Sequence, residues 1–174
     1  MKSKQIKLTG TSYALLALLD RFGELTSYEI KDALETSVEN FWPVPHTTAY
    51  QEPARLESGG YLSSRQEKSG RRRRRYALTD AGRTALRDWA DEPVAAPPQL
   101  RDELLLKIFA GADPEPLLEE RLAFFRTKVK ELETYLEAVK LAPGWSGPAT
   151  VLRAGIVYNS QQIDLIEGMI EEDR

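Results

Sequence analysis

The sequence contains no cysteine and one histidine, His46. Without cysteine, the chain cannot form a disulfide, a thiolate zinc site or a thiol nucleophile. A single histidine excludes a His-pair metal site and leaves little room for a Ser/His/Asp centre, and His46 itself is typical of a turn or capping residue. The sequence also has no Gly-rich phosphate loop and no nucleophile beside a credible base. We therefore expect neither enzymatic activity nor a cofactor or metal.

Long apolar runs are also missing. The longest, Tyr13–Leu19, is much shorter than the ~20 residues that a membrane-spanning helix requires. Three lysines precede this run, as in a signal peptide, but the charged residues Asp20 and Arg21 follow it without a small-residue cleavage pattern. We therefore expect a cytoplasmic protein.

Charge is unevenly distributed along the 174 residues. The formal net charge is −3, but residues 1–92 carry 15 basic and 13 acidic side chains, whereas residues 93–174 carry 9 and 14. Between the two parts, the segment Pro93–Pro98 contains three prolines, which exclude regular helix or sheet and favour an extended spacer. The sequence thus predicts a basic contact domain over residues 1–92, a linker over residues 93–99 and an acidic domain over residues 100–174.

The N-terminal part begins with two amphipathic helices. The spacing of Leu15, Leu18, Leu19 and Phe22 predicts a helix over residues 9–22 with these four side chains buried. Thr26 and Glu29 have the spacing of a capping box for a second helix. The buried side chains of that second helix are expected to be Ile30, Ala33, Leu34 and Val38.

A third helix is expected from residue 46 or 47 to Ser58, ended by Gly59 and Gly60. Its buried side would carry Ala49, Pro53 and Leu56. Its outer stripe is polar, which suits base edges and phosphates, and consists of Thr47, Thr48, Gln51, Glu52 and Arg55. Tyr50 could donate to a phosphate or pack beside the next segment.

Two strand-like arms follow, over residues 61–67 and 71–79, joined by a turn at residues 68–70. Thr79 or Asp80 then caps a fourth helix. Three helices, a hairpin and another helix are the order of a winged helix-turn-helix, so the expected fold class is mainly α with a small β wing. A helical bundle does not explain the hairpin, and a βαβ unit needs strands between the early helices.

Five consecutive arginines form the strongest charge signal. In a strand, Arg71, Arg73 and Arg75 would face one way and Arg72 and Arg74 the other. A phosphate backbone would neutralise them and release counterions, which predicts a wing that binds DNA. A solvated charge run or a disordered basic loop remains the alternative.

An ordered series of short motifs resembles the PadR family of transcriptional regulators. The series comprises Tyr13-Ala14-Leu15-Leu16, Ser27-Tyr28-Glu29-Ile30, Tyr50, Arg55-Leu56-Glu57-Ser58-Gly59-Gly60-Tyr61-Leu62, Gly70-Arg71 and Tyr76-Ala77-Leu78-Thr79-Asp80-Ala81-Gly82-Arg83. The run Asp102–Phe109 resembles the C-terminal domain of the longer members. The chain departs from the family at Pro53, where an aliphatic residue is usual, and at Ser27, where glycine is frequent.

The C-terminal part has heptad spacing. One helix is expected to begin near Pro114 and to end at residues 142–144; a second would run over residues 148–171. Together they predict an antiparallel hairpin whose remaining apolar side pairs with a second chain, and the expected dimer residues are Leu118, Leu122, Phe125, Val129, Leu132, Ile156, Asn159, Ile163 and Ile166. Leu136 and Val139 extend the first heptad row. Asn159 would either fix the register of the helices or lie half exposed at the dimer edge. The alternative is a hairpin that folds back on its own N-terminal domain.

These observations predict a homodimeric, sequence-specific regulator of transcription that binds double-stranded DNA. The resemblance implies a repressor that responds to a small aromatic effector. Six aromatic residues could line an effector pocket or simply belong to the core: Trp89, Phe124, Phe125, Tyr135, Trp145 and Tyr158. The alternative function is a protein-interaction module built on the helical hairpin, without specific DNA binding.

Overall fold

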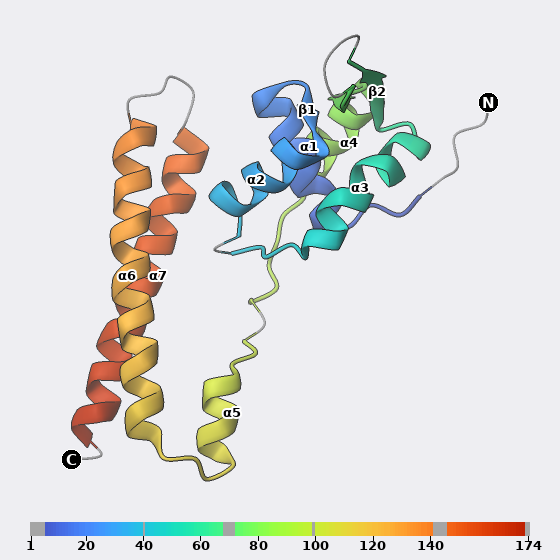
Figure 1. Cartoon of the computed structure of the whole chain (residues 1–174). Helices are drawn as coiled ribbons and strands as arrows, with labels where there is room; N and C mark the ends of the chain where they lie inside the picture. The colour runs from blue at the N-terminus through green and yellow to red at the C-terminus, as the bar shows by residue number, and fades with distance from the viewer. Residues whose placement is uncertain (1–5, 40, 68–71, 99, 141–145, 173–174) are drawn as a thin grey trace. The chain divides into compact units, whose positions relative to one another are not determined.

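Figure 1 shows the computed structural model, which describes residues 6–39, 41–67, 72–98, 100–140 and 146–172. The chain divides into two compact units, residues 1–96 and residues 97–174, which we call the winged-helix unit and the hairpin unit. Within the described ranges, the first contains four helices and a three-stranded antiparallel sheet, and the second contains three helices. The fold class predicted from the sequence, mainly helical with a small β wing, is confirmed.

Capping side chains fix the first two helices. α1 (Gly10–Phe22) begins after Thr9, whose hydroxyl accepts from the backbone N–H of Ser12. α2 (Ser27–Ser37) begins with the predicted capping box, in which the Thr26 N–H donates to the Glu29 carboxylate over 2.7 Å. The side chain of Phe22, expected in the core, is instead 44% exposed, because α1 ends there and the chain turns away at Gly23.

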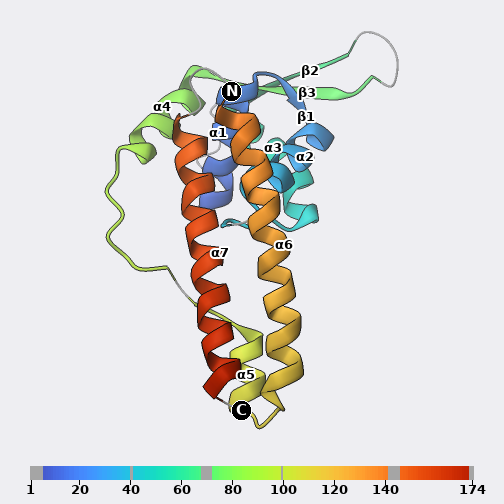
Figure 2. The same cartoon turned by 90° about the vertical axis from the view of Figure 1, so that its left-hand side faces the viewer.

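The wing is a β-hairpin extended by a short third strand. β2 (Leu62–Gln66) and β3 (Arg74–Leu78) pair antiparallel, with Leu62 opposite Leu78, and Figure 2 shows this hairpin as an arm of the unit. β1 (Leu25–Thr26) pairs with the other edge of β3, giving the order β1-β3-β2. The turn predicted at residues 68–70 lies outside the described residues.

α3 (His46–Ser58) and α4 (Asp80–Ala90) complete the winged-helix unit. Thr79 caps α4, accepting from the Gly82 N–H over 3.1 Å. Gly82 lies so close to the wing that an added Cβ would be 2.3 Å from the Tyr61 carbonyl oxygen. Helices α1, α2 and α3 and strands β2 and β3 form one buried core, against which Leu86 of α4 packs; the members of this core are Leu15, Leu16, Leu18, Leu19, Ile30, Leu34, Ala49, Leu56, Leu62, Tyr76 and Leu78.

The hairpin unit contains α5 (Glu103–Phe109), α6 (Pro114–Lys140) and α7 (Ser146–Glu172). Figures 1 and 2 both show α6 and α7 antiparallel and side by side, with α5 beside one end of α6. Arg121 of α6 holds the start of α5 through two 3.0 Å bonds to the carboxylate of Asp102. The turn predicted at residues 142–144 lies outside the described residues. None of the described helices combines the length and apolarity needed to cross a bilayer.

The heptad residues face inward within a single chain. Six of the nine residues expected at the dimer contact are already buried, namely Leu118, Leu122, Phe125, Leu132, Asn159 and Ile166. α6 and α7 of the same chain cover them, because each helix presents its apolar row to the other. The structure therefore corrects their assignment to a surface that meets a second chain. Val129, Ile156 and Ile163 are half-buried, and their part in a dimer stays a prediction.

Candidate nucleic-acid interface

α3 presents an open polar face. Ala49 and Leu56 anchor the helix in the core, and the side chains of Thr47, Tyr50 and Gln51 are exposed on the other side. Among the described residues, none forms a side-chain hydrogen bond or an ion pair with these three side chains. Thr48 is half-buried beside them. The exposed side chains are therefore free to donate to or accept from an external partner.

Pro53 lies inside α3, and the helix continues through it from His46 to Ser58. Proline has no backbone N–H, so the hydrogen bond that would join residue 53 to the carbonyl of Ala49 is missing. The ring is buried. The sequence correctly places Pro53 on the buried side of α3.

The other end of the predicted outer stripe differs from expectation. Glu52 does not face outward: only 6% of the residue is exposed, because its carboxylate turns toward α1 and is hydrogen-bonded there. Arg55 is half-buried beside it and donates to Glu52 through Nε and Nη2 over 2.7 and 2.6 Å. These hydrogen bonds raise the pKa of the Arg55 guanidinium above its ordinary value, against an opposing effect of burial.

Among the described arginines of the run, only Arg74 and Arg75 lie in β3, where they have partners on opposite faces, and both of these arginines are held by internal carboxylates. On one face, Arg74 donates to Glu57 of α3 over 2.6 Å and to the Ser64 hydroxyl over 2.7 Å. Ser64 in turn donates to the other oxygen of Glu57 over 2.7 Å. This closed ring ties the wing to the C-terminal turn of α3.

On the opposite face, Arg75 is the least exposed of the wing arginines that the structure describes, with 23% of its side chain exposed. Its guanidinium donates to the Glu24 carbonyl over 2.8 Å and lies 3.4 Å from both Glu29 and Glu67. Nearby, Arg65 forms an ion pair with Glu24, and its hydrogen bond lowers the pKa of the Glu24 carboxyl. The base of the wing is thereby fastened to the start of α2.

Arg72 and Arg73 remain available. Arg72 is exposed and forms no ion pair with any residue in the described ranges; its backbone has a positive φ of 48°. Arg73 is 54% exposed and has a long contact of 3.5 Å with Glu67. Arg71 lies outside the described residues. Within the described part of the arginine run, Arg72 has no internal carboxylate partner and Arg73 has only this long contact, whereas Arg74, also 54% exposed, and Arg75 are held by shorter internal bonds.

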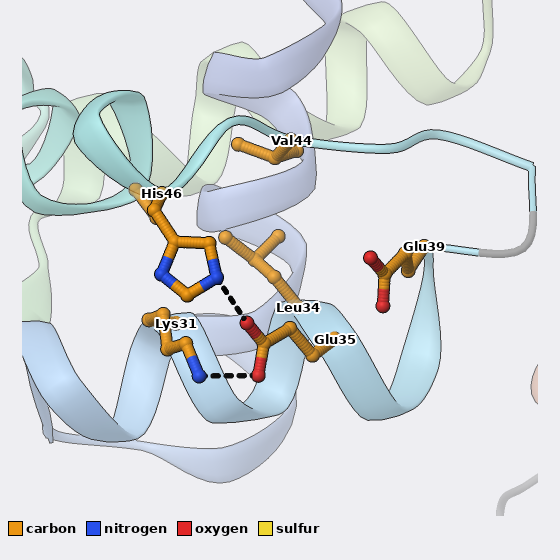
Figure 3. Close-up of a pocket in the computed structure, with 7 residues that line it drawn as sticks. Lys31, Leu34, Glu35, Glu39, Val44 and His46 are labelled. Carbon is orange, nitrogen blue, oxygen red and sulfur yellow. Dashed lines mark hydrogen bonds and ion pairs between the residues drawn. The ribbon is translucent and has the colours of Figure 1, made fainter.

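His46 begins α3 and contacts α2 (Figure 3). Its Nε2 lies 3.0 Å from the Glu35 carboxylate, which also pairs with Lys31. The cavity beside these residues has a volume of about 10 Å³, which is room for a water molecule but not for an organic ligand. His46 thus joins α2 to the first turn of α3, a structural role compatible with the expected turn or capping residue.

The six aromatic residues considered for an effector pocket have separate environments. Trp89 stacks on Tyr13 within the winged-helix unit, with ring centroids 4.4 Å apart. Phe125 belongs to the hairpin core, Tyr135 and Tyr158 are exposed, and Trp145 lies outside the described residues. Phe124 lines an open hollow of about 310 Å³ between α5 and α6, together with Leu104, Leu117 and four charged residues.

Comparisons with known proteins agree with this geometry. Residues 15–88 match the family described as Transcriptional regulator PadR-like family, and residues 100–172 match the family described as Virulence activator alpha C-term. The negative transcriptional regulator PadR of Bacillus subtilis (strain 168) is 29% identical over 128 residues, covering 70% of this chain and 70% of that protein.

Solved structures share the fold. The crystal structure of Bacillus subtilis PadR in complex with operator DNA has a TM-score of 0.80 at 24% identity, covering 96% of this chain and 99% of that one. The same PadR in complex with p-coumaric acid has a TM-score of 0.70 at 24% identity, covering 91% and 92%. A PadR-like transcriptional regulator from Bacillus cereus has a TM-score of 0.77 at 22% identity, covering 92% and 96%.

Proposed function

We propose that the chain, which matches the PadR-like family of transcriptional regulators over residues 15–88, is a homodimer that binds specific sites on double-stranded DNA and represses transcription. The observation that carries the proposal is the open polar face of α3 together with a wing on which Arg72 has no internal ion pair among the described residues and Arg73 has only a 3.5 Å contact. A helix with exposed hydrogen-bonding side chains fits the major groove, and arginines fit the flanking phosphates. Repression rather than activation is inferred from PadR of Bacillus subtilis, which is described as a negative transcriptional regulator.

The exposed residues of α3 and the arginines of the wing have different roles in DNA binding. Thr47, Thr48, Tyr50 and Gln51 of α3 contact base edges and nearby phosphates, where a glutamine can bond adenine with both ends of its amide. Arg71, Arg72 and Arg73 contact phosphates and supply affinity without sequence information. Arg55, Arg74 and Arg75 were expected at the DNA as well. Because their guanidinium groups already donate to internal partners, we infer that they hold α3 and the wing in place.

Dimerisation involves the apolar residues that the hairpin unit leaves exposed. Phe109 of α5 is 88% exposed, and the other large exposed apolar residues of this unit are Leu100, Leu105, Leu106, Phe124, Tyr135, Val151, Val157, Tyr158 and Leu165. A helical hairpin that exposes this many large apolar side chains has apolar surface for a second copy to bury. A two-fold dimer presents two copies of α3 to half-sites about one helical turn of DNA apart.

The last part of the proposal is a small-molecule effector that releases the protein from DNA. The relative crystallised with p-coumaric acid suggests a small aromatic acid as the class of ligand. Such a ligand weakens operator binding if it favours a dimer in which the spacing of the two α3 helices no longer matches the half-sites. Its site on this chain is part of the proposal.

The deciding experiment is DNase footprinting and gel shift on the DNA upstream of the protein's own gene, repeated over a range of salt concentrations. We expect one protected, two-fold symmetric site whose affinity falls linearly with the logarithm of salt concentration. Adding p-coumarate as a probe should release the DNA. Equal binding to the upstream DNA and to scrambled duplexes would contradict the proposal and favour the protein-interaction module.

A further inference from the structure

A buried carboxylate joins α3 to α1. Glu52 Oε1 accepts from the Ser12 hydroxyl over 2.6 Å and from Arg55 Nη2 over 2.6 Å, while Oε2 accepts from Arg55 Nε over 2.7 Å. Ser12 is on α1, forty positions earlier in the chain, and is fully buried. Every polar atom of the cluster has a partner, which a buried charge requires.

The Ser12 hydroxyl uses its whole hydrogen-bonding capacity. A serine hydroxyl has one proton to donate and two lone pairs to accept with. Here the proton goes to Glu52, and the oxygen accepts from the Thr9 N–H over 2.9 Å and from Arg55 Nη2 over 2.8 Å. The same hydroxyl therefore caps α1 and fixes the side chains of α3, so the two helices cannot shift independently.

Arg55 is equally occupied. Besides its bonds to Glu52 and Ser12, its Nη1 donates to the Lys7 carbonyl over 3.0 Å, in the segment before α1. All but one of the guanidinium N–H groups are thus in use. A two-bond contact with guanine needs two free N–H groups, so Arg55 could make that contact only by breaking this cluster.

We propose that Ser12, Glu52 and Arg55 form a positioning bracket that sets the orientation of α3 on α1 and thereby the sequence specificity of DNA binding. This inference rests on the proposed function. The bracket crosses from α3 to α1 at the turn where Pro53 has removed a helical hydrogen bond. It supplies fixed contacts where the helix ladder is interrupted. Arg55 acts on DNA through α3 and does not read a base.

The test compares Ser12→Ala, Glu52→Gln and Arg55→Ala with the parent chain. Ser58→Ala is the matched control, because Ser58 is on α3 and exposed, and its hydroxyl bonds only the Arg55 carbonyl within the helix. Each variant is titrated against the operator, a scrambled duplex and operators with every single base pair of a half-site replaced. Circular dichroism and the unfolding temperature of each variant select an assay temperature at which it is folded.

A positioning role predicts the same result for all three variants. Affinity for the operator should fall about tenfold or more, the usual consequence of leaving one buried hydrogen-bonding group without its partner. Discrimination should fall across the whole half-site, while affinity for the scrambled duplex and the salt slope stay at the parent values. Arg55→Lys, which keeps the charge without the planar fork, should give an intermediate loss.

The inference is overturned if Arg55→Ala relaxes a single base pair while Ser12→Ala and Glu52→Gln keep the parent specificity, since Arg55 would then read that base. It is also overturned if Ser12→Ala and Glu52→Gln are folded and bind the operator with the same affinity and specificity as the Ser58→Ala control.

Amide hydrogen exchange of α3 without DNA separates this inference from the proposed function. Faster exchange in α3 of Ser12→Ala and Glu52→Gln, about tenfold relative to Ser58→Ala, supports the bracket. Unchanged exchange overturns it. If the parent chain shows no preference for any DNA sequence, the proposed function is wrong and the bracket has no role in specificity. The rate of amide exchange would still show whether the bracket holds α3 in place.

Discussion

The two units of the chain differ in the size of their cores and in the apolar surface that they leave exposed. The winged-helix unit closes a core built from three helices and the sheet, and it exposes polar and basic side chains on α3 and the wing. The hairpin unit encloses a smaller cluster, centred on Leu104, Leu118, Leu122, Phe125 and Ile166, and leaves ten large apolar residues exposed. Among the described residues, the winged-helix unit exposes seven large apolar residues against ten in the shorter hairpin unit, so the hairpin unit has more apolar surface left to bury for its size.

The largest effect is expected from removing the exposed apolar side chains of α5. Leu106 and Phe109 are 64% and 88% exposed and three positions apart, so they share one face of the helix. Leu106→Ser combined with Phe109→Ser should raise the dissociation constant of the dimer by about 100-fold or more, as expected for central apolar residues of an interface. Sedimentation velocity over a range of concentrations measures this constant.

Phe41→Ser is the control for that pair, because Phe41 is 55% exposed but belongs to the winged-helix unit. It should leave the dimer unchanged. If the α5 pair also leaves the constant unchanged, the contact between chains does not involve this face of α5. The contrast between the two units would then have to be explained through α6 and α7.

The next effect tests which charges of the winged-helix unit are truly open. Arg72→Ala and Arg73→Ala should each reduce the slope of log affinity against log salt by about 0.9, the value for one lost phosphate contact. Arg75→Ala should leave the slope unchanged and lower the unfolding temperature, because it leaves Glu29 and Glu67 without their shared partner. An equal reduction of the salt slope in Arg72→Ala and Arg75→Ala would contradict the distinction between arginines that contact DNA and arginines that are paired within the protein.

The sequence predicts well those features that depend on residues close together in the chain. The bounds of α3 and the capping box of Thr26 and Glu29 both follow from residues within a few positions of one another. β1 escapes prediction because its two residues are too few to show a strand period. Its existence depends on pairing with β3, about fifty residues later.

The errors at the candidate site come from long-range contacts. Spacing alone puts Glu52 in the polar stripe of α3, whereas the Ser12 hydroxyl on α1, together with two hydrogen bonds from Arg55, explains why its carboxylate is buried. Heptad spacing likewise identifies the apolar rows of α6 and α7. It contains no information on whether such a row meets its own chain or another, so Leu118 and Leu132 were assigned to the wrong partner.

A smaller effect concerns pH and the start of α2. The Thr26 N–H and, less strongly, Arg75 lower the pKa of the Glu29 carboxyl from its ordinary 4.5. A lowered pKa in the folded state means that Glu29 stabilises the winged-helix unit above its ordinary pKa, and that this contribution is lost as the pH falls through the folded-state value. Since 37% of the side chain is exposed and screened by solvent, the contribution should stay below about 1 kcal/mol.

Glu29→Gln isolates that charge, because glutamine can still accept the capping bond. Urea unfolding at neutral pH and at acidic pH should show the parent more stable than the variant at neutral pH, with the difference disappearing in acid. Glu115→Gln, in the first turn of α6, is the control in the other unit. A difference that persists unchanged in acid would mean that the side chain acts by packing and not by charge.

The smallest effect is expected at Asn159, a polar residue buried inside the otherwise apolar α6–α7 contact. A polar residue at a heptad position often fixes register by pairing across helices. Here the Asn159 amide instead donates to the Gly155 carbonyl of its own helix over 2.6 Å. Its hydrogen bond is therefore satisfied without a partner helix. Asn159→Leu exchanges about 1 kcal/mol of net hydrogen bonding for a similar gain in apolar burial.

We therefore expect Asn159→Leu to raise the free energy of unfolding by less than about 1 kcal/mol and to leave a clean dimer. Sedimentation and thermal unfolding, with the exposed Gln161→Leu of the same helix as control, measure both quantities. Species larger than the dimer in Asn159→Leu, and not in Gln161→Leu, would mean that the asparagine specifies the assembly. A polar residue of the hairpin unit would then determine how many chains associate. The hairpin unit would differ from the winged-helix unit in this residue as well as in its exposed apolar surface.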